Sequence, residues 1–125
     1  MERIDTLAKI GASLISVQIE AVQIEPSALA GDSFALGYCF GLFEAMAQMA
    51  GLDQYDEAAP MMEAAFGKLV DIPQAGSALF RHALSLQVDA DYQAGVETGG
   101  VDFARWAEDA DQLPTGIARR GRAIG

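Results

Sequence analysis

Residues 34–52 read FALGYCFGLFEAMAQMAGL, and this stretch decides the fold. Its nineteen positions are apolar except for Glu44, Gln48 and the hydroxyl group of Tyr38. A helix that is apolar on nearly all sides is expected at the centre of a helical bundle. We therefore predict a central apolar helix over residues 33–51, around which the rest of the chain packs.

The same stretch is long enough to raise the question of a membrane span. A carboxylate near its middle would cost roughly 2.5–3.5 kcal/mol on insertion, and a basic anchor is typical of one flank of a span. Here the flanks on both sides are acidic, so we predict no membrane span. The N-terminus mixes charged and apolar residues and does not resemble a signal peptide, so we expect a cytoplasmic protein.

Helical spacing continues on both sides of the central segment. In residues 3–24 apolar side chains recur every three or four positions from Ile10 to Ile24, which predicts a helix. Residues 16–24 also alternate apolar and polar, so a strand there remains an alternative. Three later helices are predicted: one with Pro60 in its first turn that Ile72 and Pro73 close, one over residues 74–93, and one over about 101–111.

These five helices, joined by short connectors, predict an all-α fold. We expect a compact bundle, mostly of up-and-down neighbours, formed by residues 1–113 as a single domain. Residues 114–125 follow a proline and show no periodicity, so we expect a basic, flexible C-terminal tail.

The charge is unevenly distributed. The chain carries a net charge of −10, with −13 over residues 1–113 and +3 over residues 114–125, where Arg119, Arg120 and Arg122 lie. An acidic body repels a phosphate backbone, so we expect no binding to nucleic acid. The role of the arginine tail is open: it is either solvated or folded back on the acidic surface.

Small residues recur every four positions in the central helix, at Gly37, Gly41 and Ala45. Glycine inside a helix costs up to about 1 kcal/mol relative to alanine, so two of them call for a packing reason. We predict that this ridge seats another helix, either from the same chain or from a second copy in a dimer. The glycine-rich segment over residues 95–106 is expected to form a tight turn that leads into the last helix.

Signatures of catalytic and metal sites are missing from the sequence. A single histidine and a single cysteine exclude a zinc site built from these residues, and we predict neither a metal nor a cofactor. The phosphate-binding loop, the dinucleotide-binding glycine motif and the nucleophile elbow are also missing. Cys39 lies in the apolar run and is expected to be a buried, inert thiol. We assign no catalytic residue.

Three polar residues are weak candidates for a ligand pocket: Glu44, Arg81 and His82. Glu44 lies in the most apolar helix, where an unpaired carboxylate is costly to bury. If it is buried, Arg81, His82 or Lys68 is expected to pair with it. If it lies at the edge of the bundle, it forms a solvated stripe with Gln48, one turn away.

The leading functional hypothesis is a non-catalytic helical interaction module that forms a homodimer or binds another protein. It rests on the broad apolar faces, the ridge of small residues and the lack of catalytic signatures. The alternative is a small-ligand-binding protein or minor enzyme with a pocket near Glu44, Arg81 and His82. A third hypothesis, an acidic mimic of nucleic acid, rests on charge alone.

Overall fold

The computed structural model describes residues 2–52 and 55–119, and this part of the chain is helical with no strand. The predicted all-α class is therefore confirmed, and the strand alternative for residues 16–24 is wrong. A further helical turn covers residues 116–119. The elements are α1 (Glu2–Ala21), the 3-10 helix η1 (Pro26–Gly31), α2 (Ser33–Met49), α3 (Tyr55–Val70), α4 (Ala75–Ser85) and α5 (Ala90–Glu108).

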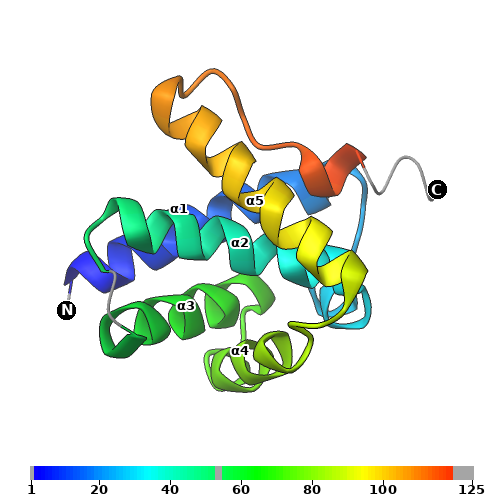
Figure 1. Ribbon diagram of the computed structural model, residues 1–125, viewed down its shortest axis with the longest axis horizontal. Coiled ribbons are helices and arrows are strands. Elements are labelled where there is room, and N and C mark those ends of the chain that lie inside the picture. Colours follow the sequence, from blue (N-terminus) through cyan, green and yellow to red (C-terminus); the bar gives the residue numbers. More distant parts are fainter. Residues whose placement is uncertain (1, 53–54, 120–125) are drawn as a thin grey trace.

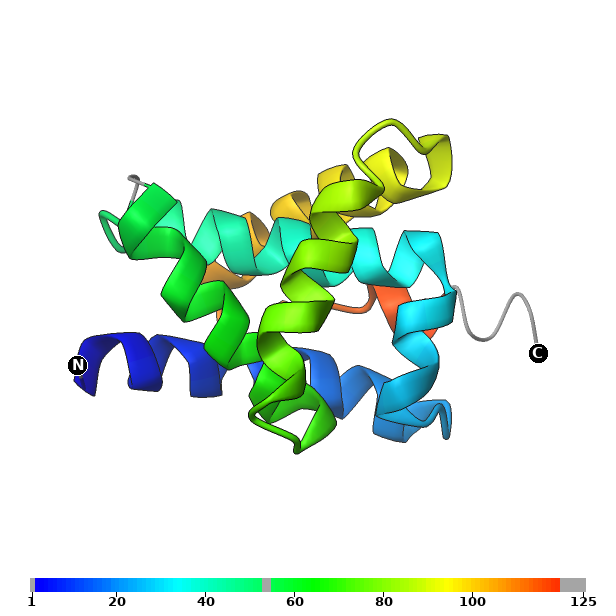
Figure 2. The ribbon, with the colours of Figure 1, turned by 90° about the horizontal axis from the view of Figure 1, so that it is seen from below.

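Helix α2 lies at the centre of the bundle, between α5 and α3 (Figure 1). Its most extensive packing is on α5, while α1 packs on α3 and α3 packs on α4. Figure 2 shows α3 and α4 crossing one side of the molecule in front of α1 and α2. Residues 35–43 are all buried, as predicted for the central helix. None of the described helices combines the length and the apolar character that crossing a membrane requires.

The ends of α2 follow from local chemistry. The Asp32 carboxylate accepts a hydrogen bond from the Ala35 amide at 3.2 Å and caps the N-terminus. At the other end Gly51 adopts a left-handed φ of +81°, which favours glycine. This conformation lets the Leu52 amide donate to the Ala47 carbonyl at 2.8 Å.

Helix α3 begins earlier than predicted, because it starts at Tyr55 and contains Pro60 in its interior. A proline at this position removes one helical hydrogen bond. Ala58 and Ala59, which precede the proline, pack on the core and are buried or half-buried, so tertiary packing favours helix there in spite of Pro60.

The largest difference between the predicted and the observed helices concerns residues 74–111. The predicted continuous helix over residues 74–93 is interrupted after Ser85, and the Asp89 carboxylate starts α5 by accepting from the Tyr92 amide at 2.9 Å. Helix α5 then runs to Glu108, so residues 95–100 lie inside a helix and form no turn. The predicted boundary at residue 101 is wrong for the same reason.

The glycine ridge of α2 lies directly against α5. A Cβ atom on Gly37 would collide with the carbonyl oxygen of Tyr92, and a Cβ atom on Gly41 would collide with that of Val96. Ala45, the third small residue, is half-buried and packs at the edge of the core. The second helix on this ridge therefore comes from the same chain.

The close approach is reciprocal, because α5 contributes glycines of its own. A Cβ atom on Gly95 would collide with the carbonyl oxygen of Phe34, and one on Gly99 with that of Tyr38. Each helix thus offers two glycines, four residues apart, to the backbone of the other. This geometry explains why α5 tolerates glycine in its interior, where the sequence alone indicates a break.

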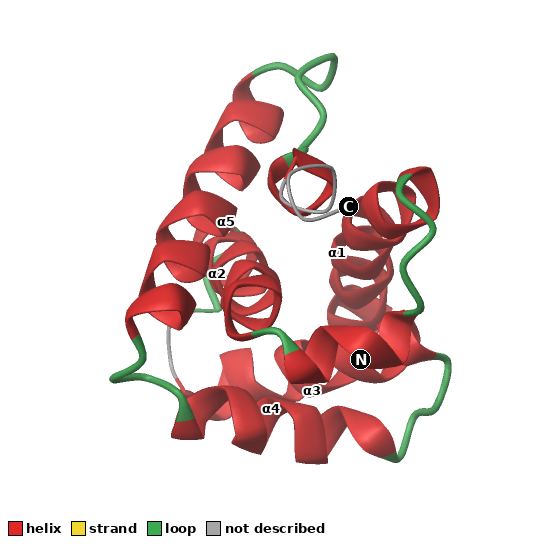
Figure 3. Cartoon of the chain, turned by 90° about the vertical axis from the view of Figure 1, so that its right-hand side faces the viewer, coloured by secondary structure: helices red, strands yellow, loops and turns green. Residues whose placement is uncertain are grey.

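The packed body extends beyond residue 113. Gly116, Ile117 and Ala118 are buried, and their helical turn lies between α1 and the α2–α5 pair (Figure 3). The flexible tail predicted from residue 114 is therefore wrong for residues 116–118. Residues 120–125, with Arg120 and Arg122, lie outside the described residues, so the tail prediction stays a prediction there.

Candidate functional site

Glu44 lies near the middle of α2 and is half-buried, while Gln48 one turn later is exposed. Within the part of the chain that the structure describes, the Glu44 carboxylate has no hydrogen bond or ion pair. Burial raises the pKa of this carboxyl group above its ordinary value. Lys68, one of its predicted partners, pairs instead with Asp5 at 2.8 Å.

Arg81 and His82 do not join Glu44. Both are exposed on α4, because the buried side of that helix is formed by Gly76, Phe80 and Ala83. The Nε2 atom of His82 lies 3.3 Å from the carbonyl oxygen of Ala30. The predicted cluster of three polar residues is not assembled in one pocket: Glu44 lines a cavity whose described lining includes neither Arg81 nor His82.

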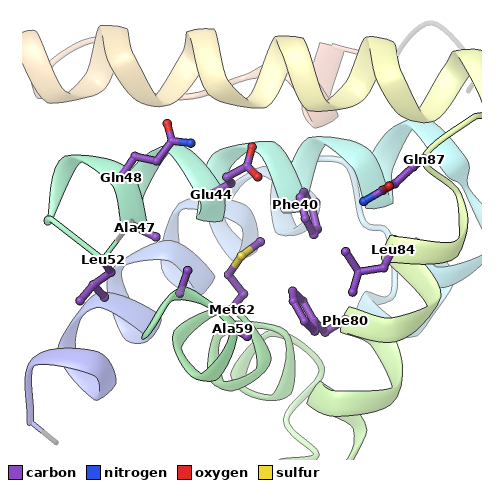
Figure 4. Close-up of a pocket in the computed structure, with 11 residues that line it drawn as sticks. Phe40, Glu44, Ala47, Gln48, Leu52, Ala59, Met62, Phe80, Leu84 and Gln87 are labelled. Carbon is purple, nitrogen blue, oxygen red and sulfur yellow. The ribbon is translucent and has the colours of Figure 1, made fainter. Parts of the chain in front are cut away.

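That cavity has a volume of about 350 Å³ and lies among α2, α3 and α4. Figure 4 shows Phe40 of α2, Met62 of α3, and Phe80 and Leu84 of α4 around the same space, with Glu44 at its edge. The wall is apolar apart from a few polar side chains at the rim. Among the described residues the lining is Phe40, Glu44, Ala47, Gln48, Leu52, Ala58, Ala59, Met62, Phe80, Leu84 and Gln87.

A second hollow of about 300 Å³ adjoins the first on the side of α5. Phe40, Glu44 and Gln87 line both spaces, so these three residues lie where the hollows adjoin. The second hollow adds Tyr92 and Val96 from the inner face of α5, together with the exposed Gln93.

The hydroxyl group of Tyr92 is buried and has no hydrogen-bond partner in the described part of the molecule. The whole residue is only 2% exposed. Burial raises the pKa of this phenol, and the negative charge of Glu44 raises it further, so the group stays neutral. A buried polar group without a partner costs about 1–3 kcal/mol, so it calls for an explanation.

Three aromatic rings are grouped at the same place. The ring centroids of Phe40 and Phe80 are 6.0 Å apart in a stacked arrangement, and those of Phe40 and Tyr92 are 6.1 Å apart. Such pairs add packing energy and also present π faces to whatever occupies the adjoining space. Aromatic faces beside one carboxylate favour a ligand that is apolar and carries a positive or hydrogen-bond-donating end.

The described side chains that line the two hollows are mostly apolar. Among the residues that the structure describes, the lining of both hollows contains no serine, threonine, cysteine, histidine, lysine or arginine. Across residues 2–52 and 55–119, no group of three or more His, Cys, Asp or Glu side chains is placed to hold a metal ion. Cys39 is buried as predicted, and burial raises the pKa of its thiol.

A second buried polar cluster is fully hydrogen-bonded and connects three helices. The Tyr38 hydroxyl donates to the Asp102 carboxylate at 2.6 Å and accepts from the Gln18 amide at 3.1 Å. The Gly116 amide donates to the same Asp102 carboxylate at 3.0 Å, and the Ile117 amide donates to Gln18 Oε1 at 2.8 Å. Since its polar atoms satisfy one another, this cluster is structural.

Sequence reasoning found Glu44 but missed Tyr92, Phe80 and Gln87 as its neighbours. One signal was present for Tyr92. Taken as an N-cap, Asp89 starts a helix on which Tyr92 shares a face with Gly95 and Gly99. No local pattern indicates that Phe80 and Gln87 approach the same point.

In comparisons with known proteins, no family model, no curated protein and no solved structure matches this chain.

Proposed function

We propose that this chain is a small-ligand-binding protein and that the cavity edged by Glu44 is its binding site. The observation that carries the proposal is an unpaired, half-buried carboxylate at the edge of an apolar space of about 350 Å³. Leaving a carboxylate there is unfavourable for the empty protein. A ligand that pairs with Glu44 while filling the apolar space would remove this penalty.

The size of the cavity limits the ligand. Ligand sites in proteins commonly measure about 300–1,000 Å³, so this one suits a compact molecule with a single ring or a short chain. Phe40 and Phe80 provide flat apolar walls, and Met62 provides an adaptable one. We propose no reaction, because the described side chains that line the space include no pair of a nucleophile and a histidine or lysine base. The cytoplasmic location predicted from the sequence remains part of this proposal.

The test is an NMR titration of ¹⁵N-labelled protein with 2-phenylethanol, a neutral compact probe. We expect saturable shifts of the amide signals of Phe40, Glu44, Leu84 and Gln87. Filling the cavity with Ala59→Leu should abolish these shifts. No saturable shift at these four residues would contradict the proposal.

The matched control for cavity filling is Ala104→Leu, which adds the same side chain at an exposed position of α5 and should leave binding unchanged. Ala59 is 7% exposed, so its replacement can also disturb packing. A thermal melt of each variant checks folding. If Ala59→Leu does not fold, Ala58→Leu takes its place, since Ala58 lines the same cavity and is only half-buried.

The interaction module predicted from the sequence remains a second proposal. The ridge of small residues was the strongest sequence argument for this module, but the ridge packs against α5 of the same chain. What supports it is the outer face of α1, where Ile10 and Val17, seven residues apart, are 36% and 56% exposed. Native mass spectrometry of wild type and Val17→Glu tests a homodimer on this face: the wild type should be dimeric and the variant monomeric, and a monomeric wild type would contradict it.

A further inference from the structure

The second hollow is lined by two residues whose side-chain oxygens have no partner among the described residues: Glu44, which also lines the first hollow, and Tyr92, whose hydroxyl group is buried. We infer that the ligand of this pocket carries a primary or secondary ammonium group, which Glu44 and Tyr92 bind together. This inference rests on the proposed function and specifies the chemistry of the ligand. Its support comes from charge, from the aromatic rings and from the count of hydrogen-bond donors.

The charge of the site has one sign. Among the described residues, Glu44 is the only charged side chain that lines either hollow. Residues 1–113 around it carry a net charge of −13. A carboxylate or phosphate ligand would meet like charge at short range, whereas a cation is attracted both by Glu44 and by the surrounding field.

The aromatic rings favour the same kind of ligand. The ring centroid of Phe40 lies 6.0 Å from that of Phe80 and 6.1 Å from that of Tyr92, and Phe40 lines both hollows together with Glu44. The faces of such rings attract ammonium groups, and more strongly where water is excluded. An apolar body attached to the ammonium group would occupy the larger hollow, against Met62 and Leu84.

The number of hydrogen-bond acceptors at the site favours a cation that carries N–H groups. A primary ammonium has three donors and no acceptor. The Glu44 carboxylate and the Tyr92 oxygen both accept, and the side-chain carbonyl of Gln87, which lines both hollows, supplies a third acceptor. A quaternary ammonium would satisfy the charge and the rings but would leave the buried Tyr92 hydroxyl without a partner.

The experiment compares 2-phenylethylammonium with its neutral counterpart 2-phenylethanol by isothermal titration calorimetry at pH 7 and low salt. We expect the ammonium compound to bind the wild type at least tenfold more tightly than the alcohol. In Glu44→Gln the two affinities should come within about twofold of each other, because the ammonium compound loses affinity and the alcohol does not.

Two further variants separate local recognition from general effects. Glu108→Gln makes the same change of charge on the exposed end of α5 and should leave the preference for ammonium intact. Tyr92→Phe should weaken 2-phenylethylammonium several-fold but leave its N,N,N-trimethyl analogue unaffected, because only the N–H compound can use the hydroxyl group.

The outcomes are distinguishable. If the alcohol and the ammonium compound bind the wild type equally well, or if 3-phenylpropanoate binds more tightly than either, the ammonium inference is overturned and the binding pocket stands. If Glu108→Gln abolishes the preference as fully as Glu44→Gln does, the inference is likewise overturned. If none of the compounds binds, the proposed function falls together with the inference.

Discussion

Two buried tyrosines in this protein stand in opposite situations. The Tyr38 hydroxyl donates a hydrogen bond to Asp102 and accepts one from Gln18, so its donor and acceptor functions are satisfied within the fold. The Tyr92 hydroxyl is equally buried and has no partner among the described residues. The first hydroxyl therefore contributes to stability, whereas the second is available to a ligand under the function proposed above.

Removing each hydroxyl in turn tests this contrast. Tyr38→Phe should lower the free energy of unfolding by about 1–3 kcal/mol, because Asp102 and Gln18 each lose a buried hydrogen bond. Tyr92→Phe makes the same chemical change without breaking a bond, so its stability should stay within about 0.5 kcal/mol of wild type or rise. Urea denaturation of both variants measures the difference, and equal losses would contradict it.

Glu44 should make stability depend on pH in an unusual direction. Its pKa is raised in the folded state, so the folded protein is favoured at low pH, where the carboxyl group is protonated in both states. That contribution is lost as the pH rises from the ordinary pKa of a glutamic acid through the raised value. We therefore expect Glu44→Gln to melt above wild type at pH 7 and at the same temperature as wild type well below pH 4.5.

Asp5 provides a control with the opposite sign. Its hydrogen bond with Lys68 lowers the pKa of its carboxyl group, so its contribution to stability is present at neutral pH and is lost as the pH falls through the lowered value. Asp5→Asn should melt below wild type at pH 7 and approach it in acid. Thermal melts across this pH range measure both variants. If the melting temperatures of both shifted in the same direction relative to wild type, the assignment would be contradicted.

At the scale of elements, the crossing of α2 and α5 depends on four glycines and is therefore intolerant of a single methyl group. Gly99→Ala should destabilise the protein by about 1–3 kcal/mol, because its Cβ atom would collide with the carbonyl oxygen of Tyr38. The matched control is the next residue: the nearest atom to a Cβ on Gly100 lies 4.0 Å away. Gly100→Ala should stabilise by about 0.5–1 kcal/mol, and denaturant titration distinguishes the two signs.

This crossing also marks the limit of prediction from the sequence. Helix α2 could be predicted within two residues, because its apolar run and its caps are local features. Helix α5 could not, because Gly95 and Gly99 have the same local appearance whether they break a helix or fit it against a neighbour. Only the partner backbone distinguishes these cases, and it lies more than fifty residues earlier in the chain.

The candidate site likewise contains one residue that local sequence features reveal and others that they do not. Glu44 could be predicted because one carboxylate is conspicuous in an apolar run. Tyr92 and Phe80 belong to helices whose boundary was misplaced, so their approach to Glu44 could not be seen. Arg81 and His82 were chosen for their chemistry, but the helical period turns them to solvent once Phe80 and Ala83 face the core.

At the scale of the whole molecule, the segment near the C-terminus completes the core. Ile117→Ala should lower the free energy of unfolding by about 2–5 kcal/mol, because the side chain is 2% exposed within the hydrophobic cluster. Ile72→Ala makes the same change at a residue that is 54% exposed and should have an effect within about 0.5 kcal/mol. Equal effects in a thermal or urea melt would contradict the packing of residues 116–118.

The polar cluster around Asp102 joins residues that are synthesised far apart in time. The Ile117 amide bonds to Gln18, ninety-nine positions earlier in the chain. During translation α1 and α2 are synthesised before residues 116–118. The polar groups of Gln18 and Tyr38 therefore stay hydrated until that segment is available. Domains generally fold as units during synthesis. For this protein the unit includes residues 116–118, so we expect a nascent chain that lacks them to leave Gln18 Oε1 without its amide donors and the core less stable.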